Sequence, residues 1–315
     1  MAERIERDAP ASVDAASVRN WCDVFGEDRV RHSVDRKGWV APPTMLATFG
    51  RPATDPGDGS TQLGLHDQLK AELSLPVGIA LGYELECHAM AREGDRLRSV
   101  ERIASVGELR STRLGPGRDW VIEVATSNQS DELVCIERWS MLGYDPNAVS
   151  STDAPAATRS APSAAEDGAS TWSSTIEVTR DLVIGGATAN RVWALGHHDD
   201  DAARAAGLAG IILDTSTWVS IAGMHASKWI GHDARPGGID LTMRRSVGVG
   251  DTIELCGDIV GDVVDGHGVR WVSIDVVGRV RGRIVATAMV RLAVDTADSV
   301  DVWALDGERW EPSIP

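Results

Sequence analysis

Cysteine is scarce in this chain and never closely paired. The four cysteines are Cys22, Cys87, Cys135 and Cys256, and no two of them form a Cys-x-x-Cys pair. The first ten residues, MAERIERDAP, lack the apolar core of a signal peptide. We therefore expect a reduced, cytoplasmic protein.

Basic residues and long apolar runs are also in short supply. Lys and Arg number 31 against 47 Asp and Glu, which gives a formal net charge of -16. No basic stripe is present to neutralise phosphates, so we expect no nucleic-acid partner. No apolar run approaches the roughly 18 residues that a membrane helix needs, so we also expect no membrane span.

The length and a biased internal stretch indicate two modules. The 315 residues suit two domains of about 150 residues each. Between them lies DPNAVSSTDAPAATRSAPSAAEDGAST, which is rich in Ala, Ser and Pro and poor in large apolar side chains. We predict a first module over residues 1–145, a linker over 146–173, a second module over 174–295 and a tail over 296–315.

The two modules repeat the same order of features. VRNWCDVFGEDRVRHSVDRKGWVAPPTMLATFG in the first and NRVWALGHHDDDAARAAGLAGIILDTSTWVSIAGM in the second each give a polar loop followed by an apolar helix. A Gly-Asp pair then precedes a run of alternating apolar residues, which is typical of a strand, in EGDRLRSVERIASV and in VGDTIELCGDIVGDVV. We predict an α+β fold in which buried helices over 40–50 and 213–225 are each wrapped by antiparallel strands, with a pseudo-two-fold relation.

These features resemble a known family. Both modules resemble MaoC-like acyl-CoA dehydratase and hydratase domains, and the whole chain resembles the double hot-dog members. VAPPTML with WCDVFGED carries the likeness in the first module, and HHDDDAARAAGLAGIILDTSTW with GVGDTIEL carries it in the second. The resemblance implies addition of water to, or its removal from, an enoyl or 3-hydroxyacyl thioester. Two general acid/base groups are needed for that reaction.

The resemblance implies an Asp and a His five residues apart, in a Gly-Asp-x-Asn-Pro-x-His pattern. Backbone N–H groups at the start of the central helix would stabilise the enolate. In the second module His197 takes the histidine position, but Val192 stands where the aspartate is expected. In the first module Asp28 fits the aspartate; the histidine position is then Ser33, and His32 lies one residue early.

Three explanations of this departure remain open. Asp214, at the start of the second helix, could replace the lost aspartate beside His197, although Asp before Thr and Ser is also an ordinary N-cap. The pocket could run another proton transfer, such as conjugate cyclisation of a polyketide-like acyl chain. The chain could instead be a non-catalytic ligand-binding or heterodimer subunit. We expect Thr215, Ser216, Trp193 and Trp218 to contact the substrate.

The stretch HHDDD is not predicted to bind a metal. Adjacent histidines in an extended loop point to opposite sides and do not readily chelate one ion. The three aspartates, Asp199, Asp200 and Asp201, precede a helical pattern. We expect them to cap the N-terminus of this helix and to place negative charge there. We expect no metal and no cofactor, with the acyl carrier as part of the substrate, and a possible homodimer.

Overall fold

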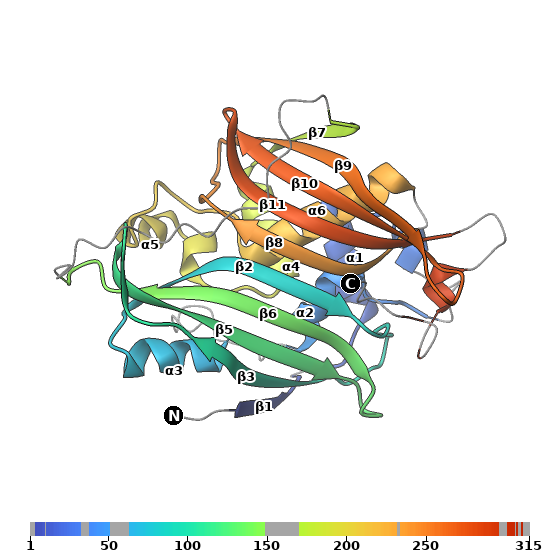
Figure 1. The fold of residues 1–315 in the computed structure, drawn as a ribbon, viewed down its shortest axis with the longest axis horizontal. Coiled ribbons are helices and arrows are strands. Elements are labelled where there is room, and N and C mark those ends of the chain that lie inside the picture. Colours follow the sequence, from blue (N-terminus) through green and yellow to red (C-terminus); the bar gives the residue numbers. More distant parts are fainter. Residues whose placement is uncertain are drawn as a thin grey trace.

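A single antiparallel sheet runs through both halves of the chain in the computed structural model (Figure 1). The structure describes residues 4–9, 11–32, 38–50, 63–148, 170–231, 234–295, 301–305, 307 and 310. In these residues the sheet has 11 strands in the order β1-β3-β5-β6-β2-β8-β11-β10-β9-β7, with β4 paired to β5. Strand order on one side of the β2–β8 pair mirrors the order on the other, as the predicted two-fold relation requires.

The first-half strands are β1 (Arg4–Asp8), β2 (Val77–Cys87), β3 (Arg98–Val106), β4 (Arg110–Thr112), β5 (Gly115–Ser127) and β6 (Leu133–Tyr144). The second-half strands are β7 (Trp172–Glu177), β8 (Arg235–Met243), β9 (Thr252–Val264), β10 (Arg270–Val280) and β11 (Arg283–Val294). Burial alternates along β10 and most of β6, as the alternation of apolar residues predicts. The predicted linker stretch 150–169 lies outside the described residues.

The second half has the long buried helix that the sequence predicts. It is α6 (Thr215–Ile230), and it extends five residues beyond the predicted end. The first-half counterpart is a 3₁₀ turn, η3 (Pro43–Met45), followed by the short α2 (Leu46–Gly50). Pro42 and Pro43 account for the late start of α2, because each lacks an N–H and a residue before proline disfavours the α conformation.

The remaining helices include two that the sequence analysis assigned to loops or left unassigned. These are α1 (Ala15–Phe25) and α4 (Arg180–Ala189), which contact each other and α6. Each begins at a capping side chain, Asp14 for α1 and Thr179 for α4. The others are η1 (Arg29–His32), α3 (Gly64–Glu72), η4 (Leu195–His197), α5 (Asp200–Ala205) and η5 (Val302–Ala304).

Two tryptophan rings pack directly against strand glycines. A Cβ built on Gly143 would lie 2.1 Å from the ring of Trp120, and one on Gly257 would lie 2.2 Å from the ring of Trp229. These close approaches give a structural role to some of the eleven tryptophans. The strands need glycine there because no space remains for a side chain.

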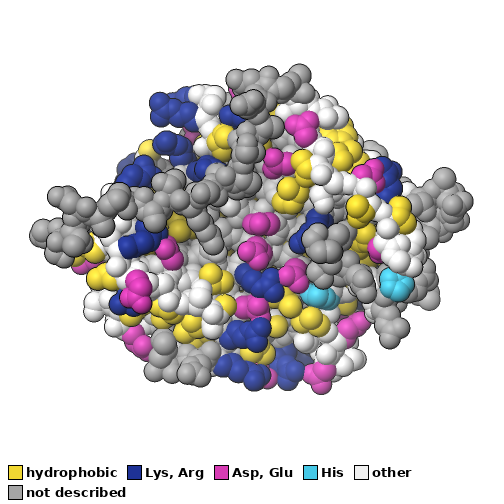
Figure 2. Space-filling model, viewed as in Figure 1, with side chains coloured by type: hydrophobic (Ala, Val, Ile, Leu, Met, Phe, Trp, Pro, Cys, Tyr) yellow, Lys and Arg dark blue, Asp and Glu magenta, His cyan; other side chains and the backbone are white. Residues whose placement is uncertain are grey.

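The outer face of the sheet carries charges of both signs. Figure 2 shows Lys and Arg side chains interspersed with Asp and Glu along the middle of this face. Arg138 of β6, for example, contacts Glu86 of β2 and Glu123 of β5. Among the described residues, no helix is long and apolar enough to cross a membrane.

Candidate functional site

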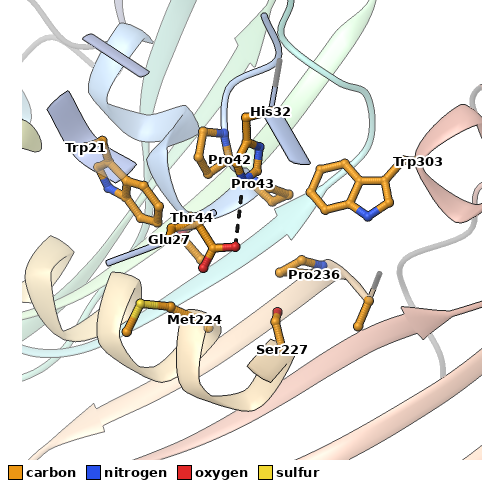
Figure 3. A pocket seen from close by; sticks show the side chains of 12 residues that line it. Trp21, Glu27, His32, Pro42, Pro43, Thr44, Met224, Ser227, Pro236 and Trp303 are labelled. Carbon is orange, nitrogen blue, oxygen red and sulfur yellow. Dashed lines mark ion pairs between the residues drawn. The ribbon is translucent and has the colours of Figure 1, made fainter. Parts of the chain in front are cut away.

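The site begins where α1 ends. Gly26 adopts the left-handed conformation with φ 64°, which terminates the helix and redirects the chain. Glu27 follows it directly, and the turn η1 then brings His32 back toward the same point. Atom Nε2 of His32 lies 3.9 Å from Oε1 of Glu27, and their side chains are only 2% and 5% exposed (Figure 3).

These two side chains line a pocket between the halves. Its volume, counted together with the space that is open to solvent, is about 270 Å³. Its polar lining includes Glu27, His32, Thr44 and Ser227. Its apolar lining includes Trp21, Pro42, Pro43, Met224, Pro236 and Trp303. The first half therefore supplies the titratable pair, while α6 and the start of β8 supply the opposite wall.

One contact fixes the ring of His32 and another fixes its backbone. The indole of Trp303 meets the His32 ring edge-on, with ring centroids 5.4 Å apart and an interplanar angle of 80°. The carbonyl of His32 accepts a hydrogen bond from the N–H of Val40 at 3.0 Å. Within the described chain, the Nδ1 atom of His32 is buried and makes no hydrogen bond. A substrate or water in the pocket could provide its partner.

A buried carboxylate facing an imidazole is suited to moving protons. The 3.9 Å separation is longer than a direct hydrogen bond, and separations of this kind admit a bridging water or tighten when substrate binds. Thr44 adds a possible donor, since it follows Pro43 in the first turn of η3, where backbone N–H groups have no partner within their own helix. The pocket thus combines a carboxylate–imidazole pair with Thr44, whose backbone N–H lies in the first turn of η3.

Of the two neighbouring carboxylates, the structure places Glu27 in the pocket lining, and not the predicted Asp28. Asp28 is exposed, whereas its neighbour Glu27 points into the pocket. Counted from Gly26, the stretch Gly-Glu-Asp-Arg-Val-Arg-His fits the Gly-Asp-x-Asn-Pro-x-His spacing with Glu in place of Asp and His32 five residues later. The sequence analysis chose Asp28 by residue type, which made His32 seem one residue early. Gly26 is the signal in the sequence for the register that puts Glu27 and His32 five residues apart.

The two histidines of HHDDD bind carbonyl oxygens in the second half. His197 ends the 3₁₀ turn η4, so it does not lie in the extended loop that the sequence analysis assumed. Its Nδ1 lies 2.8 Å from the carbonyl oxygen of Ile212. The Nε2 of His198 lies 2.7 Å from that of Val192. The first bond ties the loop between α4 and α5 to the segment before α6, and the second bond closes this loop on itself.

Asp214 serves as the N-cap of α6. Its Oδ1 accepts from the N–H of Thr217 at 3.0 Å, and its Oδ2 accepts from the Thr217 hydroxyl at 2.5 Å. No hydrogen bond joins it to His197 among the described residues, so its observed bonds are those of a cap. Asp199 likewise caps α5 through the N–H of Ala202 at 2.7 Å, as predicted.

The other predicted contact residues lie away from the Glu27–His32 pocket. Ser216 is buried in the first turn of α6 and Thr215 is half-buried beside it. Trp218 packs against Gly278, and Trp193 stacks on His198 with centroids 5.9 Å apart. Their contact with substrate remains a prediction. Among the described residues, no group of three or more His, Cys, Asp and Glu side chains could hold a metal ion.

Comparisons with known proteins establish the fold. No protein-family model matches the chain. A solved MaoC-like dehydratase superposes with a TM-score of 0.67 at 15% identity, over 93% of this chain and 98% of the other. A putative MaoC domain protein dehydratase from Chloroflexus aurantiacus gives 0.65 at 13% identity, over 93% and 95%. A Mycobacterium tuberculosis protein described as having a double hot-dog fold gives 0.62 at 16% identity, over 93% and 96%.

The chain has a double hot-dog fold. The predicted α+β architecture is thereby confirmed. A curated relative, the probable enoyl-CoA hydratase alpha subunit of Thermomonospora curvata, is 25% identical over 169 residues, which are 50% of this chain and 53% of that protein. The match thus spans about half the length of this relative.

Proposed function

We propose that this double hot-dog protein adds water to an enoyl thioester, or removes it from a 3-hydroxyacyl thioester, at the Glu27–His32 pocket. The observation that carries the proposal is the buried carboxylate facing a buried imidazole across 3.9 Å. The five-residue spacing of the pair and the names of the structural neighbours and of the curated relative support it.

In the hydration direction, one proton is held between the carboxylate of Glu27 and the imidazole of His32. Glu27 accepts a proton from a bound water as the water oxygen bonds to C3 of the enoyl group. His32 donates a proton to C2, and the proton on Glu27 then passes to His32. The pair returns to its starting state, and the substrate gains one water. Dehydration runs the same steps in reverse.

The thioester carbonyl gains negative charge when C3 is attacked. We assign the N–H of Thr44 to that oxygen, because this N–H lies in the first turn of η3 and has no partner within the turn. Preorganised donors of this kind stabilise developing charge without reorganisation. The apolar walls formed by Trp21, Met224 and Trp303 strengthen the interaction by excluding water.

The second half is proposed to be non-catalytic. Val192 stands where an aspartate would be needed, and the His197 ring is bonded to the carbonyl of Ile212. The carboxylate of Asp214 accepts hydrogen bonds from the N–H and the hydroxyl of Thr217. The second half instead contributes the α6 wall of the pocket, so one site per chain is expected.

The test is turnover of crotonyl-CoA and of 3-hydroxybutyryl-CoA by the full chain. Glu27→Gln and His32→Ala should each lower kcat by about 10²- to 10⁴-fold, the usual size of an acid/base contribution. Asp28→Asn is the matched control, because it removes the neighbouring but exposed carboxylate. If Asp28→Asn lowers kcat as much as Glu27→Gln does, the assignment of Glu27 is wrong. An unaltered chain that turns over neither thioester would refute the proposed function.

A further inference from the structure

The segment after the last strand closes one side of the pocket. We call residues 301–305, 307 and 310 the C-terminal segment. The N–H of Val302 donates to Oδ1 of Asp295 at 3.0 Å, which fixes the start of the segment just beyond β11. Val302, Trp303 and Trp310 are buried in an apolar cluster with side chains from both halves, including Val40 and Trp271.

A buried arginine anchors this segment to the sheet. Arg235, the first residue of β8, donates from Nη1 to the carbonyl oxygens of Val302 at 3.2 Å and Leu305 at 2.8 Å. Its guanidinium also lies 3.5 Å from the centroid of the Trp310 ring. The indole N–H of Trp310 donates to the carbonyl of Cys87, at the end of β2, at 2.6 Å. The segment is therefore tied to both central strands of the sheet.

These anchors place the indole of Trp303 against the acid/base pair. Trp303 is 3% exposed, lines the pocket and meets the His32 ring edge-on. Figure 3 shows it on the opposite side of His32 from Trp21.

We propose that Trp303 sets the length of the acyl group, so that the pocket takes short-chain enoyl or 3-hydroxyacyl thioesters and excludes long-chain ones. The inference rests on the proposed function. The large indole lies against the imidazole of His32 in the pocket wall, and so restricts the space for a chain that extends beyond C3. Arg235 acts through the carbonyls of Val302 and Leu305 to keep that indole in position.

The experiment compares kcat/KM for crotonyl-CoA, trans-octenoyl-CoA and trans-dodecenoyl-CoA in the full chain. The unaltered protein should prefer crotonyl-CoA. Trp303→Ala should raise the octenoyl-to-crotonyl ratio by about tenfold or more, since each methylene accommodated in an apolar pocket contributes about tenfold or more. Trp172→Ala is the matched control, because Trp172 stacks on Trp229 and does not line the pocket. It should leave the ratio unchanged.

The possible outcomes separate this proposal from the proposed function. If Glu27→Gln abolishes turnover but Trp303→Ala leaves the ratio unchanged, the length proposal is overturned and the function stands. If the unaltered chain prefers dodecenoyl-CoA, the length proposal is also overturned, while the proposed function stands. Absence of turnover with every thioester overturns both. Should Trp303→Ala not fold, the milder Trp303→Leu carries the same comparison.

Discussion

Lys228, on α6 of the second half, donates a hydrogen bond from Nζ to the carbonyl oxygen of Gly26 at 3.0 Å. Gly26 directly precedes Glu27, so this contact links the second half to the loop that carries Glu27 and His32. The two halves thus depend on each other at the site. The first half supplies Glu27 and His32, and the second half supplies a wall of the pocket and a hydrogen bond to their loop.

Replacing Lys228 should weaken catalysis mildly. Lys228→Met removes one hydrogen bond at an exposed position, where such a bond is worth about 0.5 to 1.5 kcal/mol. We expect kcat for crotonyl-CoA to fall by about two- to tenfold with little change in KM, because the loop is less well fixed while the pocket wall is intact. Lys70→Met, on the distant helix α3, is the control. Equal losses in both variants would show that charge alone is responsible.

His197→Ala should spare turnover, in contrast to His32→Ala. The ring of His197 holds the Ile212 carbonyl, so its removal should lower the thermal midpoint while kcat changes by no more than about threefold. Asp214→Asn keeps a side-chain acceptor for the N–H of Thr217 and should also leave kcat intact. A fall in kcat of about 10²-fold or more for His197→Ala is the usual size of an acid/base contribution. That result would contradict the assignment of the site to the first half and favour His197.

The fold was largely predictable because its signals are local. Alternating apolar residues predict β10 and β11, and the cap at Asp214 followed by an apolar run predicts α6. The site was predictable only in part. His32 was among the predicted residues, but Glu27, which lies beside it in the pocket, was not, because its placement depends on the backbone turn at Gly26. The placement of Trp303 depends on Arg235, which is 68 residues away in sequence. No local pattern reports such a contact.

Acid should destabilise the protein through two buried histidines. Burial lowers the pKa of His66 and of His225 to about 4, with smaller contributions from Lys70 and Lys228 respectively. The unfolded chain takes up a proton on each below a pKa of about 6.5, whereas the folded chain does so only near 4. Stability is therefore complete above about pH 6.5 and is lost as pH falls toward 4, by up to about 1.4 kcal/mol per pH unit and per histidine.

Urea unfolding at about pH 7 and about pH 5 measures this loss. His225→Gln should lower stability at neutral pH, since the contact with Ser174 is altered, but should reduce the further loss on acidification. His267→Gln is the control, because His267 is exposed in the turn after β9. If His225→Gln and the unaltered chain lose equal stability between the two pH values, His225 does not titrate as argued.

Gly143→Ala should destabilise the first half by overpacking. The added methyl group would lie 2.1 Å from the ring of Trp120, which is 1% exposed and donates from Nε1 to Nδ1 of His66 at 3.2 Å. Because the ring is almost fully buried, the methyl group forces its neighbours to shift, and we expect a loss of about 1 to 3 kcal/mol in the free energy of unfolding, measured by urea titration. Gly266→Ala, where a Cβ meets nothing within 4 Å, should change it by less than about 0.5 kcal/mol. A neutral Gly143→Ala would mean that the indole can shift, and that its contact with glycine is not what fixes it over β6.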